Sequence, residues 1–265
     1  MAAGAIFALA LALACQGHLV QGGLAVCTTA PGAEVLVDGL STRADASGYA
    51  VIGFDRDAPA ISHVLARDGG QEAAIDLAIA PRSWNIQRVD GLPEQTVTPT
   101  DPAVQERIAR DIKAKAAALT SRAPGTGFLE KWAWPVQTGR ISGAFGNARV
   151  LNGVAKRPHY GVDIANRVGT PLVAPASGLV TFARSGLHYE GGLIFIDHGQ
   201  GLTSMYLHLS EISVQEGQKI AAGDQLGLVG ATGRATGPHV CWRLKWRDRN
   251  LDPSVLVETQ LFAPQ

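Results

Sequence analysis

Two pairs of metal-binding side chains stand at spacings that suit one face of a β-strand. His159 and Asp163 enclose three residues in the stretch RPHYGVDIA, and Gly161 between them has no side chain to block them. His239 and Cys241 are two residues apart in GPHVCWRLKW. Side chains at even spacings along a strand point to the same face, and imidazole, carboxylate and thiolate are all zinc ligands. The two pairs together predict a zinc site, although each pair alone would be a weak signal.

A third histidine, His208, lies in the strand-like segment MYLHLS. It follows the alternating residues Met205 and Leu207, so its side chain is expected on the opposite face of that strand. Histidines that are hydrogen-bonded in a core or at its rim would explain the same positions. Spacing alone therefore does not decide between a metal site and structural histidines.

Short apolar runs with glycine or proline between them surround these residues. Over residues 132–257 the runs include PLVAPASGLVTFA, GLIFIDHG, LTSMYLHL and DQLGLVGA. Runs of this length, bounded by turn residues, are typical of β-strands, and no amphipathic helix interrupts them. We therefore expect an all-β domain over residues 132–257, closed or folded on itself, with a tail over residues 258–265.

The same segments resemble the lysostaphin-type zinc peptidases, a family that includes peptidoglycan endopeptidases. The resemblance rests on GRISGAFG, PHYGVDIANRVGTPLVAPASGLVTFA, YLHLS and VQEGQKIAAGDQLGLVGATGRATGPHV, which follow the family's motif order. It implies that His159 and Asp163 are zinc ligands and that His208 and His239 are the catalytic histidines. The family's third ligand is a histidine two residues after His239, a position that Cys241 holds in this chain.

A cysteine at position 241 is compatible with zinc but changes the charge of the site. Zinc held by one histidine, one aspartate and one thiolate is neutral, whereas two histidines and one aspartate leave a charge of +1. A neutral centre is a weaker Lewis acid, so the resemblance implies a slower enzyme. In the alternative interpretation Cys241 is only a small buried side chain and the site is inactive. A zinc or redox sensor at Cys241 is a further alternative.

The resemblance implies a zinc metalloendopeptidase that hydrolyses peptide cross-links of bacterial peptidoglycan, with Zn²⁺ as its cofactor and stem peptides as its substrate. The alternative function is a regulator that binds peptidoglycan or activates a cell-wall amidase. The chain has 23 basic and 23 acidic side chains. No cluster of Lys and Arg marks a nucleic-acid groove, which argues against a nucleic-acid-binding protein.

The N-terminus has the composition of a secretory signal. Its apolar run over residues 2–14 is shorter than the roughly 20 residues that span a bilayer, and it ends in the small residues Ala12 and Ala14. Cys15 follows directly and indicates a lipid anchor as an alternative. No Lys or Arg precedes Arg43, which is unusual for a signal, so a buried apolar helix or a misassigned start is the other interpretation. We expect a signal over residues 1–18 and an exported, periplasmic protein, attached to a membrane only through Cys15.

The remaining segments predict a small domain and a connection. Residues 19–90 alternate short apolar runs with turns, which predicts a small β-sandwich without catalytic residues. Residues 91–131 begin with a proline-rich linker and continue as a helix with Asp101 as its N-cap. An apolar stripe of that helix comprises Val104, Ile108, Ile112 and Leu119. If the signal is removed, Cys27 and Cys241 are the remaining cysteine pair, and no bridge is expected because they lie in different domains.

Overall fold

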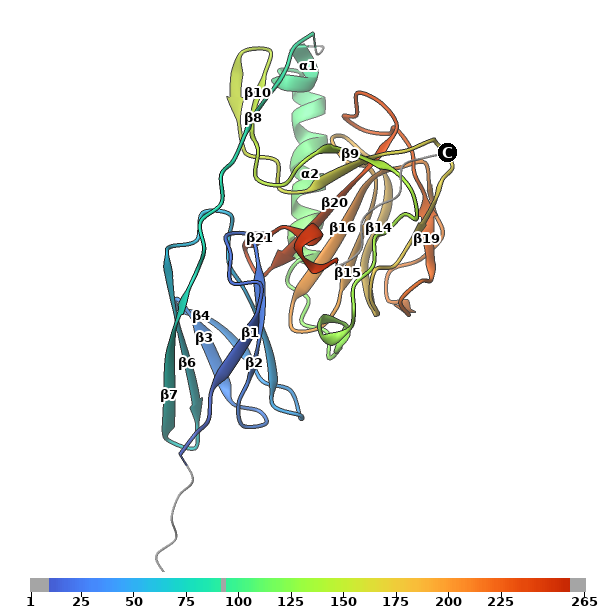
Figure 1. The fold of residues 1–265 in the computed structure, drawn as a ribbon. Coiled ribbons are helices and arrows are strands. Elements are labelled where there is room, and N and C mark those ends of the chain that lie inside the picture. Colours follow the sequence, from blue (N-terminus) through green and yellow to red (C-terminus); the bar gives the residue numbers. More distant parts are fainter. Residues whose placement is uncertain (1–9, 92–93, 258–265) are drawn as a thin grey trace, which may run out of the picture.

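The computed structural model describes residues 10–91 and 94–257. It contains an N-terminal β-sandwich, a linker with one long helix and a C-terminal β-domain (Figure 1), so the predicted all-β architecture is confirmed. The C-terminal domain carries the residues with candidate chemistry. The N-terminal domain and the linker matter for this function through the places where they contact it.

The N-terminal sandwich consists of two antiparallel sheets. Along its strands every second side chain is buried, for example Val35 and Val37 on one strand and Val64 and Ala66 on its neighbour. This alternation is what a sheet with one face in a core requires. One sheet has the order β1 (Ala14–Gly17), β2 (Leu24–Thr28), β5 (Tyr49–Gly53), and the other has the order β4 (Leu40–Arg43), β3 (Glu34–Val37), β6 (Ile61–Asp68), β7 (Gln71–Ala78).

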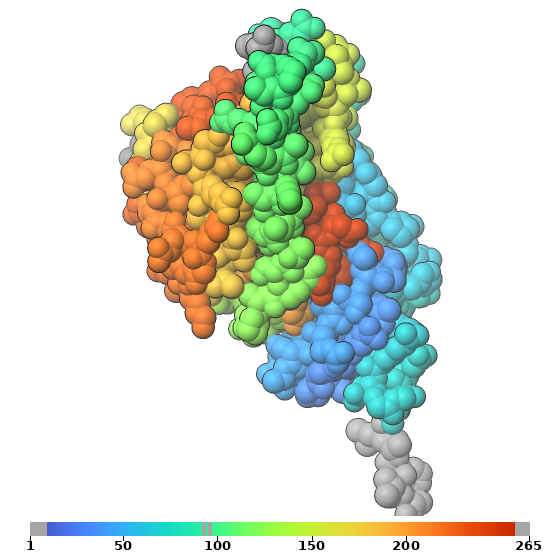
Figure 2. Space-filling view, turned by 180° about the vertical axis from the view of Figure 1, so that it is seen from behind, coloured from blue at the N-terminus to red at the C-terminus, as the bar shows by residue number. Residues whose placement is uncertain are grey.

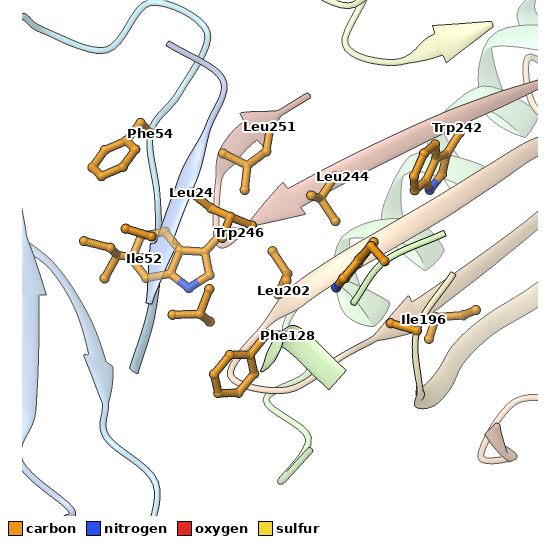
Figure 3. Packing of buried hydrophobic residues seen from close by; sticks show 14 of the residues in the cluster. Leu24, Ile52, Phe54, Phe128, Ile196, Leu202, Trp242, Leu244, Trp246 and Leu251 are labelled. Atoms are coloured by element: carbon orange, nitrogen blue, oxygen red, sulfur yellow. The ribbon is translucent and has the colours of Figure 1, made fainter. Parts of the chain in front are cut away.

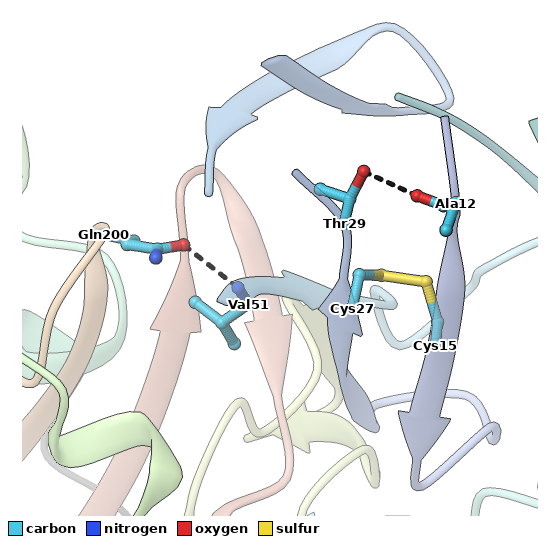
Figure 4. Close-up of a disulfide and its surroundings, with 6 residues drawn as sticks. All are labelled: Ala12, Cys15, Cys27, Thr29, Val51 and Gln200. Atoms are coloured by element: carbon cyan, nitrogen blue, oxygen red, sulfur yellow. Dashed lines mark hydrogen bonds between the residues drawn. A yellow bond between two sulfur atoms is a disulfide. The ribbon is translucent and has the colours of Figure 1, made fainter. Parts of the chain in front are cut away.

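A disulfide joins the first two strands. Cys15 on β1 lies opposite Cys27 on β2, and the two sulfur atoms are bonded (Figure 4). The predicted lipid anchor at Cys15 is therefore wrong, because a sulfur in a disulfide cannot also form a thioether to a lipid. Residues 14–17, which the sequence assigned to a signal, form β1, and residues 1–9 of that signal lie outside the described residues. Cys241 is left as a free, buried cysteine.

The linker contains a short helix, α1 (Glu94–Val97), and the long helix α2 (Pro102–Ala118). The predicted N-cap is confirmed, since the Asp101 side chain accepts hydrogen bonds from the backbone N–H groups of Ala103 and Val104. The predicted apolar stripe is wrong at Ile112, which is 56% exposed. None of the described helices is long and apolar enough to cross a membrane.

Helix α2 contacts the C-terminal domain through a face that includes Leu119 of the predicted stripe but leaves Ile112 exposed. Its half-buried apolar residues there are Ala114, Ala118 and Leu119. Asp111 accepts a hydrogen bond from the backbone N–H of His188 at 2.9 Å, and Lys115 forms an ion pair with Glu190. Figure 2 shows α2, in green, lying lengthwise on the surface of this domain. These polar contacts with the turn after β14 rotate the helix away from the orientation that its apolar pattern predicted.

The C-terminal domain is built on one large antiparallel sheet. Its two central strands, β15 and β16, are buried at every position because both faces of the sheet are covered there. The strand order is β18 (Lys219–Ile220), β14 (Gly178–Leu187), β15 (Gly191–Asp197), β16 (Leu202–Leu209), β20 (His239–Trp246), β12 (Val162–Ala165), β9 (Arg140–Gly143), with β21 (Arg249–Leu251) also paired to β20. A smaller sheet comprises β13 (Pro171–Val173), β19 (Gln225–Leu228) and β17 (Glu211–Ile212). Two short 3₁₀ helices span Gly127–Leu129 and Pro253–Leu256.

A third sheet is formed by strands from both sides of the linker. The strand β8 (Ile86–Val89) pairs in parallel with β10 (Ala148–Leu151), which forms a hairpin with β11 (Val154–Lys156). The sequence placed residues 86–89 at the end of the N-terminal sandwich. In the structure they lie beside the C-terminal domain, where the β10–β11 hairpin offers an edge for pairing.

The two domains share one continuous hydrophobic core. Ile52 and Phe54 from the N-terminal sandwich belong to the same buried cluster as Trp246 and Leu251 from the C-terminal sheet (Figure 3). A Cβ atom at Gly53 would lie 2.9 Å from Leu251, so the two layers approach closely at this point. Between the domains the Val51 N–H also donates to the side chain of Gln200 at 3.0 Å (Figure 4). The N-terminal domain is therefore packed onto the large C-terminal sheet through both apolar contacts and hydrogen bonds.

Candidate metal centre

Two adjacent strands and the loop before one of them bring the predicted ligands together. Asp163 on β12 lies directly opposite Cys241 on β20 in the antiparallel pairing. His159 does not lie on β12, as its spacing had suggested, but in the loop that leads into this strand. One ligand atom from each of these three residues lies within 4.8 Å of the others. The structure thus brings all three predicted metal ligands into one cluster.

The distances within this cluster suit a zinc ion. His159 Nε2 lies 3.0 Å from Asp163 Oδ1 and 3.4 Å from Cys241 Sγ. Tetrahedral zinc with its usual bond lengths separates a nitrogen and a sulfur ligand by about 3.5 Å. All three side chains are buried, so water competes little for them. The donor set of imidazole, carboxylate and thiol is one that zinc binds, and the residues present therefore fit this metal.

Gly161 leaves the room that the cysteine needs. A Cβ atom at this position would lie 3.0 Å from Cys241 Sγ and 2.6 Å from a side-chain carbon of Arg243. Real Cβ atoms almost never come so close to other heavy atoms, so an alanine would push Cys241 or Arg243 aside. The sequence had identified Gly161 as a residue that would not block the ligands, and the structure agrees.

Burial controls the protonation of the three ligands. Burial, and then the charge of Asp163, raises the pKa of the Cys241 thiol to about 12. Burial also lowers the pKa of His159, against the effect of its hydrogen bond to Asp163. For Asp163 burial alone would raise the pKa, but the hydrogen bond and charge of His159 together with the Arg149 charge bring it well below its usual range. Without a metal, the site therefore holds an ionised Asp163 and a protonated thiol.

Two arginines contact the ligand residues from outside the cluster. Arg149 Nη2 donates to Asp163 Oδ2 at 3.0 Å, while its Nε donates to the side chain of Gln87 at 3.2 Å. Arg243 Nε donates to Cys241 Sγ at 3.4 Å. Sequence reasoning missed all three of these contacts. Arg243 could have been found as the next same-face residue after Cys241 on its strand, whereas nothing local indicates Gln87 or Arg149.

The two predicted catalytic histidines face each other beside the ligands. The ring centres of His208 and His239 are 4.6 Å apart, and His239 Nε2 lies 3.8 Å from Asp163 Oδ1. His208 Nδ1 donates to the carbonyl of Thr232, and His239 Nδ1 donates to the carbonyl of Gly237, each at 2.8 Å. In the neutral state each histidine therefore has an Nε2 that can accept a proton.

His208 owes its position to an unusual backbone conformation. Its φ angle is +69°, in the left-handed region that residues other than glycine rarely adopt. Its N–H donates to the Glu190 carbonyl at 2.8 Å, which fixes the end of β16. Burial, together with the charge of His239, lowers the pKa of His208 to about 4, so that it is neutral at physiological pH. Such strained positions are often found at functional sites.

A groove leads to this centre. Its volume is about 820 Å³, and it runs between α2, the β10–β11 hairpin and the face of the large sheet. Its floor comprises Leu193, Phe195, Met205 and Leu207, and His159 lies at its lining as well. A second, smaller hollow of about 100 Å³ is lined by Asp163, His208, His239 and Cys241. The cluster thus borders a groove that is open to solvent.

Comparisons with known proteins agree with this geometry. Residues 157–253, which contain all five candidate site residues, match the family described as Peptidase family M23. A crystal structure of a protein from Pseudomonas aeruginosa described as a peptidase M23 is 30% identical, with a TM-score of 0.70, and the match covers 90% of this chain and 94% of that one. This chain belongs to peptidase family M23. The similarity to the Pseudomonas M23 protein also includes the N-terminal domain, which the family match does not.

Curated relatives share the M23 domain within longer proteins. Peptidoglycan DD-endopeptidase ShyA of Vibrio cholerae is 44% identical over 113 residues, which cover 42% of this chain and 26% of ShyA. DD-carboxypeptidase/endopeptidase Mpg of Neisseria meningitidis is 37% identical over 127 residues, which cover 47% of this chain and 29% of Mpg. The M23 chain described here therefore matches less than a third of the length of either relative.

Proposed function

We propose that this protein is a zinc-dependent endopeptidase that cuts peptide cross-links in bacterial peptidoglycan. The observation that carries the proposal is the convergence of three buried zinc donors, His159, Asp163 and Cys241, with two histidines whose Nε2 atoms can accept a proton. The names of ShyA and Mpg, both of them endopeptidases, support peptide hydrolysis, and that of ShyA supports peptidoglycan as the substrate.

The ligand residues and the two histidines have different roles in the proposed hydrolysis. Zinc held by His159, Asp163 and Cys241 would act as the Lewis acid of the site. His239, which lies at the edge of the ligand cluster, accepts the proton of the attacking water at its Nε2. The proton that His239 accepts passes to the leaving amine. His208 is neutral with its proton on Nδ1, so it donates a hydrogen bond to the oxygen on which negative charge develops only after its Nε2 takes up a proton from water, which that negative charge favours. The hydrogen bonds of both Nδ1 atoms to backbone carbonyls leave both Nε2 atoms free to accept these protons.

We also propose that the protein acts outside the cytoplasm. Peptidoglycan lies there, and the apolar run over residues 2–14 resembles an export signal. The Cys15–Cys27 disulfide supports the same location, because disulfides persist in oxidising compartments such as the periplasm. Attachment to a membrane is not part of this proposal.

The proposal is tested by zinc content and by hydrolysis of purified cross-linked muropeptides. We expect about one zinc per chain and cleavage of the cross-link by the wild type. His239→Ala should keep the zinc, because His239 is not a ligand, and should lose at least about a hundredfold in rate. His63→Ala provides a matched control, since His63 is an exposed histidine of the N-terminal sandwich, paired with Asp76, and this variant should keep full activity.

Three outcomes would contradict the proposal. If a zinc-loaded wild type does not cleave any cross-linked muropeptide, the alternative of a regulator that binds peptidoglycan or an amidase is favoured. If His239→Ala is as active as the wild type, His239 has no part in the reaction. A folded protein that binds no zinc after reconstitution would remove the peptidase mechanism altogether.

A further inference from the structure

Three guanidinium groups line the small hollow that contains the site residues. Among the described residues, its charged lining comprises Arg149, Arg234 and Arg243 against a single carboxylate, Asp163. The larger groove continues this positive charge with Lys156 and Arg157. Zinc would add to it. Like charges gathered in a partly buried hollow repel one another, and an anion that entered would reduce this repulsion.

The arginines reach the hollow from different parts of the chain. Arg149 belongs to β10 and Arg243 to β20, while Arg234 lies in the loop before β20 and stacks on the Tyr189 ring at 4.5 Å. The backbone N–H of Arg234 donates to the Tyr189 carbonyl, which anchors that loop. Burial lowers the pKa of Arg234, and the nearby charges of Arg149 and Arg243 act in the same direction. The three guanidinium groups thus interact with each other around one space.

The structural partners of these arginines do not prevent them from binding a substrate group. Arg149 bonds to Asp163 through Nη2, and Arg243 bonds to Cys241 through Nε. A guanidinium group has five N–H donors, so it can hold a protein partner and an incoming anion at the same time. Arginine is also the side chain whose fork of donors matches a carboxylate best.

We propose that Arg149, Arg234 and Arg243 form a subsite for a carboxylate of the substrate, immediately beside the scissile amide. The inference rests on the proposed function and specifies its substrate class. It selects cross-links in which the amide nitrogen and a free carboxylate are attached to the same carbon, as in a diamino dicarboxylic acid that is acylated on one amine. A cross-link through an uncharged glycine or through a lysine side chain has no carboxylate at this place.

Two synthetic cross-linked dimers test this subsite. They differ only in one group, which is a free carboxylate in the first dimer and a carboxamide in the second, on the carbon that bears the scissile nitrogen. We expect the wild type to cleave the free acid with a kcat/KM at least about tenfold higher, as charge-assisted hydrogen bonds are stronger than neutral ones. Equal values for the two dimers would overturn the proposal.

Arg234 is the informative position, because the other two arginines contact ligand residues. Arg234→Gln should lower kcat/KM for the free acid by a larger factor than kcat/KM for the carboxamide, so that the ratio of the two values falls toward one. Arg234→Lys keeps the positive charge but loses the paired N–H donors of the guanidinium group. Its ratio of kcat/KM for the free acid to kcat/KM for the carboxamide should therefore lie between those of the wild type and Arg234→Gln. Arg67→Gln removes an exposed guanidinium from β6 and should leave the preference unchanged. A preference that survives in Arg234→Gln, with zinc content as in the wild type, would contradict the role of Arg234.

A binding measurement separates this inference from the proposed function. Zinc-loaded His239→Ala protein should bind the free-acid dimer at least about tenfold more tightly than the carboxamide dimer in calorimetry. This result would support the subsite even if the wild type hydrolysed neither dimer, an outcome that would reject the endopeptidase alone. Equal affinities for the two dimers would reject the subsite, whatever the activity. If Arg234→Gln does not fold, the subsite is still tested by two comparisons of the dimers: their affinities for His239→Ala and their kcat/KM values with Arg234→Lys.

Discussion

At the scale of single residues, Cys241 distinguishes this site from the ligand set that the family resemblance implied. Its thiol replaces an imidazole, and Arg243 next to it donates a hydrogen bond to the sulfur. A guanidinium beside a thiolate offsets the negative charge that this ligand brings to the metal. The effect on the Lewis acidity of zinc is therefore smaller than the ligand charges alone would suggest.

The protonation of Cys241 predicts how zinc binding depends on pH. The thiol must lose a proton when it binds zinc, because its pKa without metal is raised to about 12, whereas Asp163 is already ionised and His159 already neutral. The Kd for zinc of the wild type should thus fall about tenfold per pH unit between pH 7 and 9. Competition with a chromophoric chelator under reducing conditions measures it.

Two substitutions at the same position serve as controls. Cys241→His should show a shallower dependence on pH, because a neutral imidazole binds zinc without losing a proton. Cys241→Ser should bind zinc much more weakly at every pH, because a hydroxyl replaces the thiolate. Tight binding by Cys241→Ser, or equal slopes for the wild type and Cys241→His, would show that the sulfur is not a ligand.

The sequence indicated which candidate site residues come together, but not what surrounds them. His159, Asp163 and Cys241 were identified because their types and spacing suit a metal, and because the family resemblance assigned each position. Arg149 could not be identified this way. Its contact with Asp163 depends on the pairing of β8 with β10, which joins segments about 60 residues apart along the chain. Non-local pairing of this kind leaves no periodic signal in the sequence.

At the scale of elements, hydrophobic patterns predicted the strands well and the orientation of α2 poorly. Strands such as β3 and β6 of the sandwich were visible because they bury alternate side chains. Helix α2 has no fully buried residue, and its position depends on Asp111 and Lys115, which bond to the turn after β14. Polar contacts of this kind depend on which groups the neighbouring surface presents, and the sequence of the helix does not show this. Its apolar stripe therefore did not predict which side of the helix faces the domain.

The disulfide between β1 and β2 predicts a measurable share of stability. Replacing Cys15 by serine should lower the free energy of unfolding by about 2–3 kcal/mol, because the bridge closes a loop with a sequence separation of 12 residues. Cys27→Ser and the double variant should lose the same amount, since all three remove one bond. Chemical denaturation of oxidised protein measures these values. A wild type with three titratable thiols when unfolded without reductant would contradict the bridge.

At the scale of the whole molecule, a buried histidine away from the ligands links folding to pH. His198 donates from Nδ1 to the Ser177 carbonyl at 2.8 Å, and its Nε2 accepts from the Ser204 hydroxyl at 2.7 Å. Its ring also lies 4.5 Å from that of Trp132, in the core that the two domains share. Burial lowers the pKa of His198 from 6.5 to about 4, so the folded protein keeps this side chain neutral.

The unfolded chain takes up a proton at this histidine below about pH 6.5, whereas the folded chain does so only near pH 4. The stabilisation is therefore complete above pH 6.5 and is lost as the pH falls toward 4. Between pH 7.5 and pH 5 the free energy of unfolding should fall by about 2 kcal/mol through His198. Denaturant titrations of His198→Gln should show a pH dependence that is smaller by this amount. An unchanged dependence in His198→Gln would refute the assignment.

The parallel pairing of β8 with β10 limits how this chain can be recombined with others. A gene rearrangement that joined residues 132–257 to a new partner would retain the three proposed zinc ligands and both proposed catalytic histidines. It would nevertheless discard β8, which pairs with one edge of β10 and supplies Gln87 to Arg149. The unpaired edge of β10 would then be open to a strand of another molecule, next to the catalytic centre. The transferable unit of this enzyme therefore begins at or before Ile86, within the segment that the sequence marks as the end of a different domain.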